Sequence, residues 1–429
     1  MILPQFRRAV LVFTYEDYRL YLGGASKAVL AQEQCMLEYK ISVLTLFPFN
    51  LARGKIGKKK WLMRIDGEVA AVANTDEIIL LLGRIVQSGY EIGGVQIHHF
   101  KNLDLNSLSH IIDSIEAKIF FYLHDYYTLC PNGNGNLLKK DDELCDYETY
   151  DLDRCKGCNL YSNQINEIRA FFNRYQERMT FIAPSDACKR IWCSGFKEYQ
   201  NKVIVIYHQT EVGSYKRNNN EIKDEIRVGF VGTQAVNKGW PDYKKLIKSL
   251  GDKSKHYKFY YFGNAKEIIN DVTNVPVDFH SGLNSMTEAI RNNDIDIVLL
   301  LSNRPETYSY TYYESKCADA FIIAYDCSGN IADQICKTSN GLVLRNVDDL
   351  ISYLYDIDRV RDDLNLYKRS EHLSPFDLIE NSEFIELLDF KGQSYNSIKT
   401  KAILKNSFPN SVLVKLYLIQ SKLRNHTTK

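Results

Sequence analysis

The segment DIVLLLSNRPETYSYTYYES, residues 296–315, decides the fold class of this 429-residue chain. Its first part, 296–302, is a short apolar run typical of a buried strand. A polar stretch follows, and then a helical segment that we expect to start near Ser309. Two glutamates, Glu306 and Glu314, lie on either side of this start with seven residues between them. Because parallel α/β sheets bind ligands beyond the carboxyl ends of their strands, both carboxylates are candidates for a binding site.

Glu314 also has a purely structural interpretation. Thr311 and Glu314 have the spacing of a capping box, in which both side chains satisfy free N–H groups of a first helical turn. On spacing alone the two interpretations are about even. On the ligand interpretation, backbone N–H groups at Ser309, Tyr310 and Thr311 form an anion site at the helix start. The two carboxylates then accept hydrogen bonds from sugar or ribose hydroxyls.

Short apolar runs alternate with longer amphipathic segments along the chain, which is the pattern of parallel α/β sheets. The expected strands of the first half are residues 9–15, 41–47, 95–100, 118–124, 180–185 and 202–208, and those of the second half are 227–233, 258–263, 296–302, 320–326 and 341–345. The polar segment 211–226 has the composition of a linker. We therefore predict two doubly wound domains with a ligand cleft between them. The expected parts are residues 1–210 with an insertion at about 126–165, residues 222–375, and a basic helical tail at 376–429.

Composition excludes several classes of protein. The chain is 45% hydrophobic and 25% charged, as in ordinary globular proteins. A net charge of +1 provides no overall field for nucleic acid. The sequence shows no apolar run long enough for a transmembrane helix and no secretory pattern at its start. Its ten cysteines are spread over a long chain, unlike those of a secreted disulfide scaffold. We expect a cytoplasmic protein that binds no nucleic acid.

Two loops at strand ends are candidate phosphate sites. Gly23 and Gly24 follow the first expected strand and precede a helix, so the backbone there can approach an anion closely. The strand that opens the second half contains Gly232 and leads to Lys238, whose ammonium group can neutralise a phosphate. Taken alone, each loop has an ordinary alternative, a tight turn or a solvated lysine. A diphosphate flanked by two carboxylate-held polyols describes a nucleotide sugar.

Histidines stand at the ends of two strands in the first half. Side-chain alternation places Gln96 and His98 on one face of the strand and His99 on the other. The next expected strand ends in His124, followed by Asp125. Histidine suits proton handling near neutral pH and hydrogen bonding to sugar or phosphate. The alternative for each is a structural histidine.

These motifs together resemble the GT-B fold glycosyltransferases of the retaining GT4 type. The resemblance rests on the E-x7-E pattern after a strand, the Asn-Lys-Gly loop at 237–239 and the Gly-Gly loop, and it covers roughly residues 9–360. The run PETYSYTYYES…AFIIAYD…GNIADQI looks closest to bacterial members that build cell-surface polysaccharides. The resemblance implies a UDP-, GDP- or dTDP-sugar donor, a glycan or polyprenyl-linked glycan acceptor, and no cofactor required for catalysis.

The resemblance also implies roles for single residues. Lys238 binds the donor diphosphate, Glu306 contacts the transferred sugar and Glu314 the ribose, while His98 faces the reacting centre. The predicted catalytic residues are His98, His124, Lys238 and Glu306. The predicted donor-binding residues are Gly23, Gly24, Gly232, Lys238, Ser309, Tyr310, Thr311 and Glu314.

One departure from the family pattern is informative. The family usually carries an arginine shortly before the lysine, but here Gly232 is followed by Thr233, Gln234 and Ala235. One phosphate-neutralising charge is therefore missing or comes from elsewhere. Two alternatives stay open: a sugar-nucleotide 2-epimerase, and a non-catalytic subunit that keeps the fold.

Two further features concern a metal site and the membrane. Four cysteines end in a CxxC pair, and four thiolates would suit a structural zinc; the alternative is four unrelated thiols. They are Cys130, Cys145, Cys155 and Cys158. Basic residues at 53–60, and a basic tail from Lys391 with the apolar stretch 411–419, indicate docking on anionic lipid at the inner face of the cell membrane. A solvated face and an ordinary last helix explain them equally well.

Overall fold

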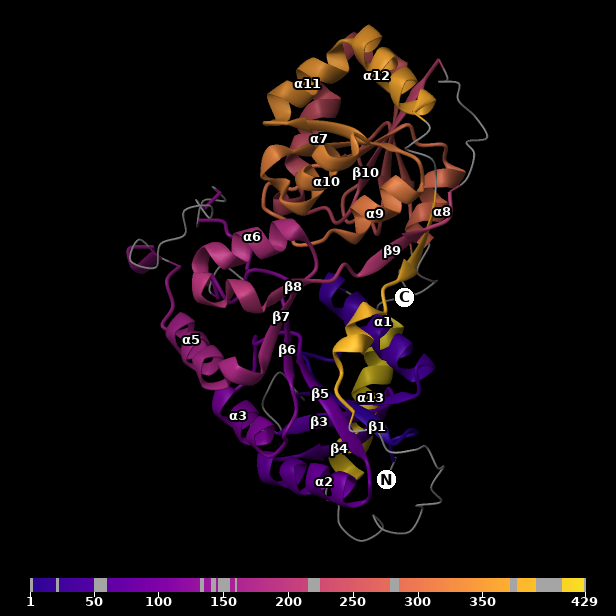
Figure 1. Ribbon diagram of the computed structural model, residues 1–429. Coiled ribbons are helices and arrows are strands. Elements are labelled where there is room, and N and C mark those ends of the chain that lie inside the picture. Colours follow the sequence, from indigo (N-terminus) through magenta and orange to yellow (C-terminus); the bar gives the residue numbers. More distant parts are fainter. Residues whose placement is uncertain are drawn as a thin grey trace.

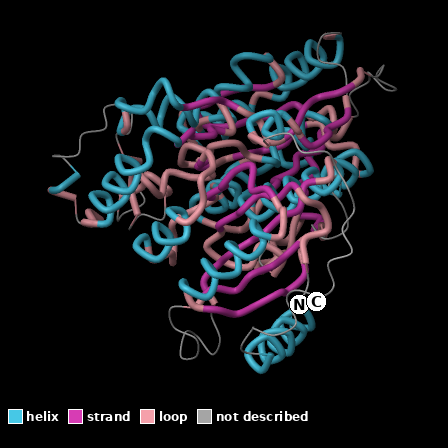
Figure 2. The backbone as a smooth tube through the Cα atoms, turned by 60° about the horizontal axis from the view of Figure 1, so that its bottom comes forward, coloured by secondary structure: helices cyan, strands magenta, loops and turns pink. Residues whose placement is uncertain are grey.

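The computed structural model shows two α/β domains, one above the other in Figure 1. It describes residues 3–20, 23–49, 60–131, 135–139, 144–145, 155–158, 160–214, 224–277, 285–370, 376–390 and 411–427. Strands run through the middle of the molecule and helices lie on the outside (Figure 2). The expected α/β class with two doubly wound domains is confirmed.

The first domain holds an eight-stranded sheet of order β4-β3-β2-β1-β5-β6-β7-β8. Its strands are β1 (Arg8–Phe13), β2 (Ile41–Pro48), β3 (Trp61–Ile65), β4 (Glu68–Ala73), β5 (Glu91–Ile97), β6 (Ile119–Tyr122), β7 (Met179–Ala183) and β8 (Val203–Val205). Its helices are α1 (Gly24–Glu38), α2 (Thr75–Gln87), α3 (Leu105–Asp113), α5 (Gln164–Tyr175) and α6 (Asp186–Gly195). All strand pairs are parallel except β2–β3 and β3–β4.

The second domain holds a six-stranded parallel sheet of order β12-β11-β10-β13-β14-β15. The strands are β10 (Ile226–Val231), β11 (Tyr257–Phe262), β12 (Val272–Val275), β13 (Ile297–Leu300), β14 (Phe321–Tyr325) and β15 (Gly341–Leu344). The helices are α7 (Trp240–Ser249), α8 (Ser285–Asn292), α9 (Tyr310–Cys317), α10 (Asn330–Thr338), α11 (Val347–Tyr355) and α12 (Ile357–Arg369). Numbered within the domain, the order is 3-2-1-4-5-6, that of a Rossmann domain with its ligand crevice between the first and fourth strands.

The chain returns to the first domain after α12. Strand β16 (Asp377–Glu380) pairs antiparallel with β9 (Gln209–Val212), which follows β8. Beyond it, η9 (Glu383–Leu387) packs with Phe390 on the first sheet. The region 376–429 is therefore more than a helical tail, since its first part completes the first domain. Residues 391–410 lie outside the described part.

The last helix, α13 (Ser411–Thr427), packs against β4 and its neighbours. Tyr417 is buried beside Phe49, and its hydroxyl donates a hydrogen bond to Asp17. Leu416 and Ile419 stay 44% and 57% exposed. None of the helices in the described part is both long and apolar enough to cross a membrane.

Strand β5 begins at Glu91, four residues before the expected strand, and ends at Ile97. Gly93 and Gly94 hide its start, because two glycines break the apolar run that marks a strand. A Cβ at Gly93 would come within 2.3 Å of the Phe390 ring. The glycines thus let the returning segment lie against the sheet.

Direct contacts join the two domains. The Ser185 hydroxyl donates to the Thr307 carbonyl at 2.6 Å, and the Thr307 hydroxyl donates to the His124 carbonyl at 2.7 Å. At the rim, Arg190 pairs with Asp333 at 2.9 Å. The loop before α9 therefore lies directly on the carboxyl edge of the first sheet.

Candidate functional site

Glu306 is fixed through its own backbone. Its N–H donates to the Ser328 carbonyl at 3.1 Å, and its carbonyl accepts from Asn330 at 2.9 Å. Gly329, between these partners, has φ +63°, and a Cβ there would come within 2.8 Å of the Glu306 nitrogen and oxygen. Glycine is required at this position because any side chain would push the loop off the start of α10.

Two cations surround the Glu306 carboxylate. The Lys238 ammonium lies 2.6 Å from Oε1, the Ser302 hydroxyl donates to the same oxygen at 2.8 Å, and Arg304 Nε lies 3.7 Å away. Burial raises the pKa of Glu306, but the charges of Lys238 and Arg304 and the two hydrogen bonds outweigh it. They lower the pKa from 4.5 to about 2, so this group is ionised at neutral pH.

Gly239 brings Lys238 to this position. It has φ +77°, and a Cβ there would come within 2.2 Å of the Leu301 carbonyl oxygen at the end of β13. The turn between β10 and α7 can therefore pack tightly on β13 only with glycine. Lys238, one residue earlier, then meets the loop after β13.

Glu314 is buried and pairs with a lysine of the first domain. Its Oε1 lies 2.6 Å from the ammonium of Lys27, in α1, and this ammonium also lies 4.4 Å from the centre of the Tyr310 ring. The capping-box interpretation is wrong. The helix begins at Tyr310 after Ser309, whose φ is +71°. Glu314 is then the fifth helical residue, two positions beyond the third, whose side chain closes a capping box.

The glycines of the two predicted phosphate loops are less crowded than Gly239 and Gly329. Among the described residues, nothing lies within 4 Å of a Cβ added at Gly23, Gly24 or Gly232. Gly23 is the N-cap of α1 and provides no side-chain cap. Packing within the described chain therefore does not demand glycine at Gly23 or Gly24, whereas the φ of +134° at Gly232 itself favours glycine. The first N–H groups of α9 have no intrahelical acceptor.

His98 and His124 lie side by side. His98 Nδ1 lies 2.8 Å from His124 Nε2. Stacked rings extend this pair in both directions: Tyr122 lies 4.4 Å from His98, His208 lies 5.7 Å from His124, and Tyr310 of the second domain lies 5.5 Å from His208. We call this group the ring column; it consists of Tyr122, His98, His124, His208 and Tyr310.

The histidines of the ring column are neutral at neutral pH. Burial lowers the pKa of His124 to about 4, against the opposing charge of Asp125. Burial, first, lowers the pKa of His98 and of His208 well below 6.5; the neighbouring histidines add to this shift, and so does Lys27 at His208. His98 Nε2 is buried without a hydrogen-bond partner in the described structure, and the ring lines a small cavity with Thr14 and Ser26. Neutral imidazole suits hydrogen bonding to a sugar hydroxyl.

His99 points to the other face, as alternation predicts. The Lys101 N–H donates to its Nδ1 at 2.8 Å, so Nε2 carries the hydrogen and donates to Asp125 at 3.1 Å. Burial opposes ionisation of Asp125, but His99 and the backbone hydrogen bond from Tyr127 outweigh it and lower its pKa. Gln96 donates to the Tyr122 hydroxyl at 3.1 Å, on the His98 side.

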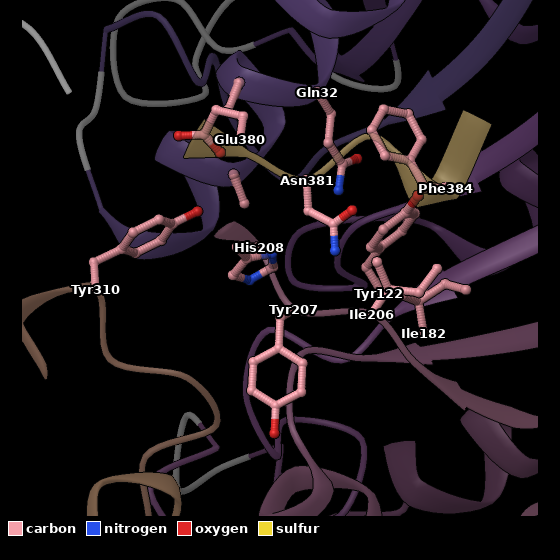
Figure 3. Close-up of a pocket in the computed structure, with 12 residues that line it drawn as sticks. Gln32, Tyr122, Ile182, Ile206, Tyr207, His208, Tyr310, Glu380, Asn381 and Phe384 are labelled. Atoms are coloured by element: carbon pink, nitrogen blue, oxygen red, sulfur yellow. The ribbon is translucent and has the colours of Figure 1, made fainter. Parts of the chain in front are cut away.

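A cavity is lined by side chains of both domains, among them Tyr310, whose ring the Lys27 ammonium contacts (Figure 3). The cavity is lined by His208 from the loop before β9, by Tyr310 from α9 and by Glu380 from β16. Gln32 of α1 lines it as well. Burial, first, and the charge of Glu314 raise the pKa of Glu380 to about 7, while Lys27 lowers it. Sequence analysis missed Glu380 because β16 returns from far along the chain. It also missed His208, although that residue ends an expected strand just as His124 does.

The described residues give no geometric support to the expected zinc site of four cysteines. Among the residues that the structure describes, no group of three or more His, Cys, Asp or Glu side chains could hold a metal ion. Cys130 and Cys145 pack at the edge of the first core. Much of the intervening chain is outside the described residues, so the four-thiolate zinc site stays a prediction.

Comparisons with known proteins place the fold. The sequence matches no protein-family profile and no curated protein. The structure is similar to that of Anabaena HepE in complex with UDP and glucose, with a TM-score of 0.53, 14% identity, and coverage of 85% of this chain and 94% of that one. A glycosyltransferase from Rickettsia africae is similar with a TM-score of 0.53 and 12% identity, and the match covers 85% of this chain and 93% of that one. Sucrose-phosphate synthase from Thermosynechococcus elongatus is similar with a TM-score of 0.52 and 11% identity, and the match covers 85% of this chain and 94% of that one.

At such low identity these likenesses concern the fold alone. Together with the two sheet orders, they define a GT-B fold, in which two Rossmann-like domains face each other. The predicted site residues lie at the carboxyl edges of the two sheets, which is where open α/β sheets in general bind ligands.

Proposed function

We propose that this protein is a retaining glycosyltransferase that transfers a sugar from a nucleotide-sugar donor to a glycan or lipid-linked glycan acceptor. The observation that carries the proposal is the pair of buried carboxylates at the domain boundary. Glu306 stands in a cationic cluster beside the start of α9, and Glu314 lies one helix turn further on. Carboxylates spaced in this way can hold the hydroxyls of two sugars linked by a diphosphate.

In the proposed reaction, the bond from the anomeric carbon to the donor phosphate breaks, and a bond to the acceptor oxygen forms on the same face of the sugar. The acceptor proton moves to an oxygen of the departing diphosphate. Lys238 and the first N–H groups of α9 stabilise the charge that develops on this leaving group. Neutral His98 holds a hydroxyl at the reacting end of the sugar.

The acceptor and its setting extend the proposal. The resemblance to bacterial enzymes of surface-polysaccharide synthesis supports a glycan or polyprenyl-linked acceptor. Exposed Leu416 and Ile419 of α13 would then face the membrane that carries it. Flotation with anionic liposomes tests this part: the full chain should float, whereas the double variant Leu416→Ser, Ile419→Ser should not.

The first experiment is thermal unfolding with UDP, GDP, dTDP and CMP, on the wild type and on Glu314→Ala. A ligand at about 100 times its dissociation constant stabilises a protein by roughly 2.7 kcal/mol. We expect one nucleotide to raise the unfolding temperature of the wild type and not that of the variant. No response to any nucleotide or to the matching nucleotide sugars would contradict the proposal. Binding without hydrolysis or transfer of the sugar would favour the non-catalytic subunit.

A further inference from the structure

The cluster around Glu306 carries more positive than negative charge. One carboxylate faces two cations, Lys238 at 2.6 Å and Arg304 at 3.7 Å. The side chains of Lys238, Arg304 and Glu306 are only 32%, 17% and 11% exposed. Excess charge in a place with little access to water is unfavourable unless a counter-charge joins it. The cluster is therefore one negative group short.

Arg304 is the member whose hydrogen bonding is incomplete. At 3.7 Å its Nε contacts Glu306 as an ion pair but is too far for a hydrogen bond. This buried N–H has no hydrogen-bond partner in the described part of the chain. A guanidinium presents its donors as a planar fork that matches two oxygens of a phosphate.

Thr233, Gln234 and Ala235 stand where the resemblance leads one to expect an arginine, and the longest of them, Gln234, already has hydrogen-bond partners. Its Oε1 accepts from the N–H groups of Lys266 and Glu267 at 2.6 and 2.8 Å, and its Nε2 donates to the Glu267 carbonyl at 2.7 Å. Gln234 therefore ties down the loop after β11 and does not serve the site. The second phosphate-binding charge has to come from another residue.

We propose that Arg304 supplies this charge and binds the β-phosphate of the donor together with Lys238. The inference rests on the proposed function and names a residue for it. The β-phosphate is assigned by position, since Arg304 adjoins Glu306, the carboxylate at the transferred sugar. Glu314, at the ribose, lies further along α9. Lys238 acts as a point charge, and Arg304 adds the fork that orients the phosphate.

The test compares a nucleoside diphosphate with its monophosphate, using whichever of UDP, GDP and dTDP binds the wild type. Calorimetry is run on the wild type, Arg304→Gln, Arg304→Lys and the control Arg345→Gln. Arg345 is exposed in the same domain and pairs with Asp349. We expect Arg304→Gln to weaken the diphosphate about 10- to 100-fold, as for a lost charged hydrogen bond, and the monophosphate less than about twofold. Arg304→Lys should recover part of the loss, and the control should match the wild type.

Equal losses for both nucleotides would overturn the inference, because a merely structural arginine would not distinguish them. No loss for either would also overturn it. If Arg304→Gln does not fold, Arg304→Lys keeps the charge without the fork, and it must still lose diphosphate affinity selectively. If the wild type binds no nucleotide at all, the proposed function fails as well, and this outcome is distinct from the other two.

Discussion

The two carboxylate–lysine pairs have the same length and different origins. Lys238 and Glu306 approach to 2.6 Å within the second domain, in a loop held by Gly239 and Gly329. Lys27 and Glu314 also approach to 2.6 Å, but they join the first domain to the second. The first pair is present however the domains lie, whereas the second requires them to meet. On the proposed function, the first pair is preorganised for chemistry. The second pair would couple domain closure to donor binding, because the donor ribose would compete with Lys27 for Glu314.

The largest expected effect comes from Glu306→Gln. The amide keeps the size of the side chain but not the charge that holds Lys238 and a sugar hydroxyl. We expect kcat for release of nucleoside diphosphate from the donor to fall about 100- to 1000-fold. The unfolding temperature with the diphosphate present should still rise. Glu198→Gln, at a surface pair with Arg169, is the control. Normal turnover by Glu306→Gln would remove Glu306 from the mechanism.

The second prediction concerns the pair between the domains. Lys27→Met leaves the buried Glu314 without its cation and should cost about 1–3 kcal/mol in urea unfolding, less than for a fully buried pair because Lys27 is partly exposed. The double variant Lys27→Met, Glu314→Gln should be less destabilised than the sum of the single variants. Additive losses would show that the pair is not a stabilising contact.

Small-angle scattering sharpens the same comparison. Lys27→Met should raise the radius of gyration in the absence of nucleotide, because one tie between the domains is lost. Lys238→Met should leave it unchanged, since its partner lies in its own domain. Equal changes in the two variants would mean that the second pair does not control closure.

Sequence alone predicts the position of a candidate residue well where that residue directly follows an apolar strand. The apolar run of β13 places Glu306 beyond a strand end, and the structure confirms that position. The hairpin β3–β4 was missed, although Asp66-Gly67 between two apolar runs marks a two-residue turn and both have positive φ.

What sequence could not predict depends on distant contacts. Lys27 and Glu314 are 287 residues apart, and no local pattern links them. The capping spacing of Thr311 and Glu314 misled, because a positive φ at Ser309 sets the helix start two residues earlier than the box requires. Arg304 lies in the loop after β13, and only the fold brings Lys238 to the same carboxylate.

The smallest expected effect tests Glu380, a carboxyl group close enough to interact with both Lys27 and Glu314. Its pKa is raised from 4.5 in the unfolded chain to about 7 in the folded one. Between these values the folded state holds more protons, so its stability falls as pH rises and the loss is complete above about pH 7. Glu380→Gln removes this cost. We expect the variant to unfold at a higher temperature than the wild type at pH 8.5, and at nearly the same temperature at pH 5.

The exposed Glu383→Gln should show no such difference. Adding Lys27→Met to the wild type should move the transition to higher pH, because Lys27 is the cation that lowers this pKa. A gain in unfolding temperature that is the same at both pH values would mean that Glu380 is ionised in the folded protein throughout this range, and that the Lys27 ammonium serves both carboxylates rather than Glu314 alone.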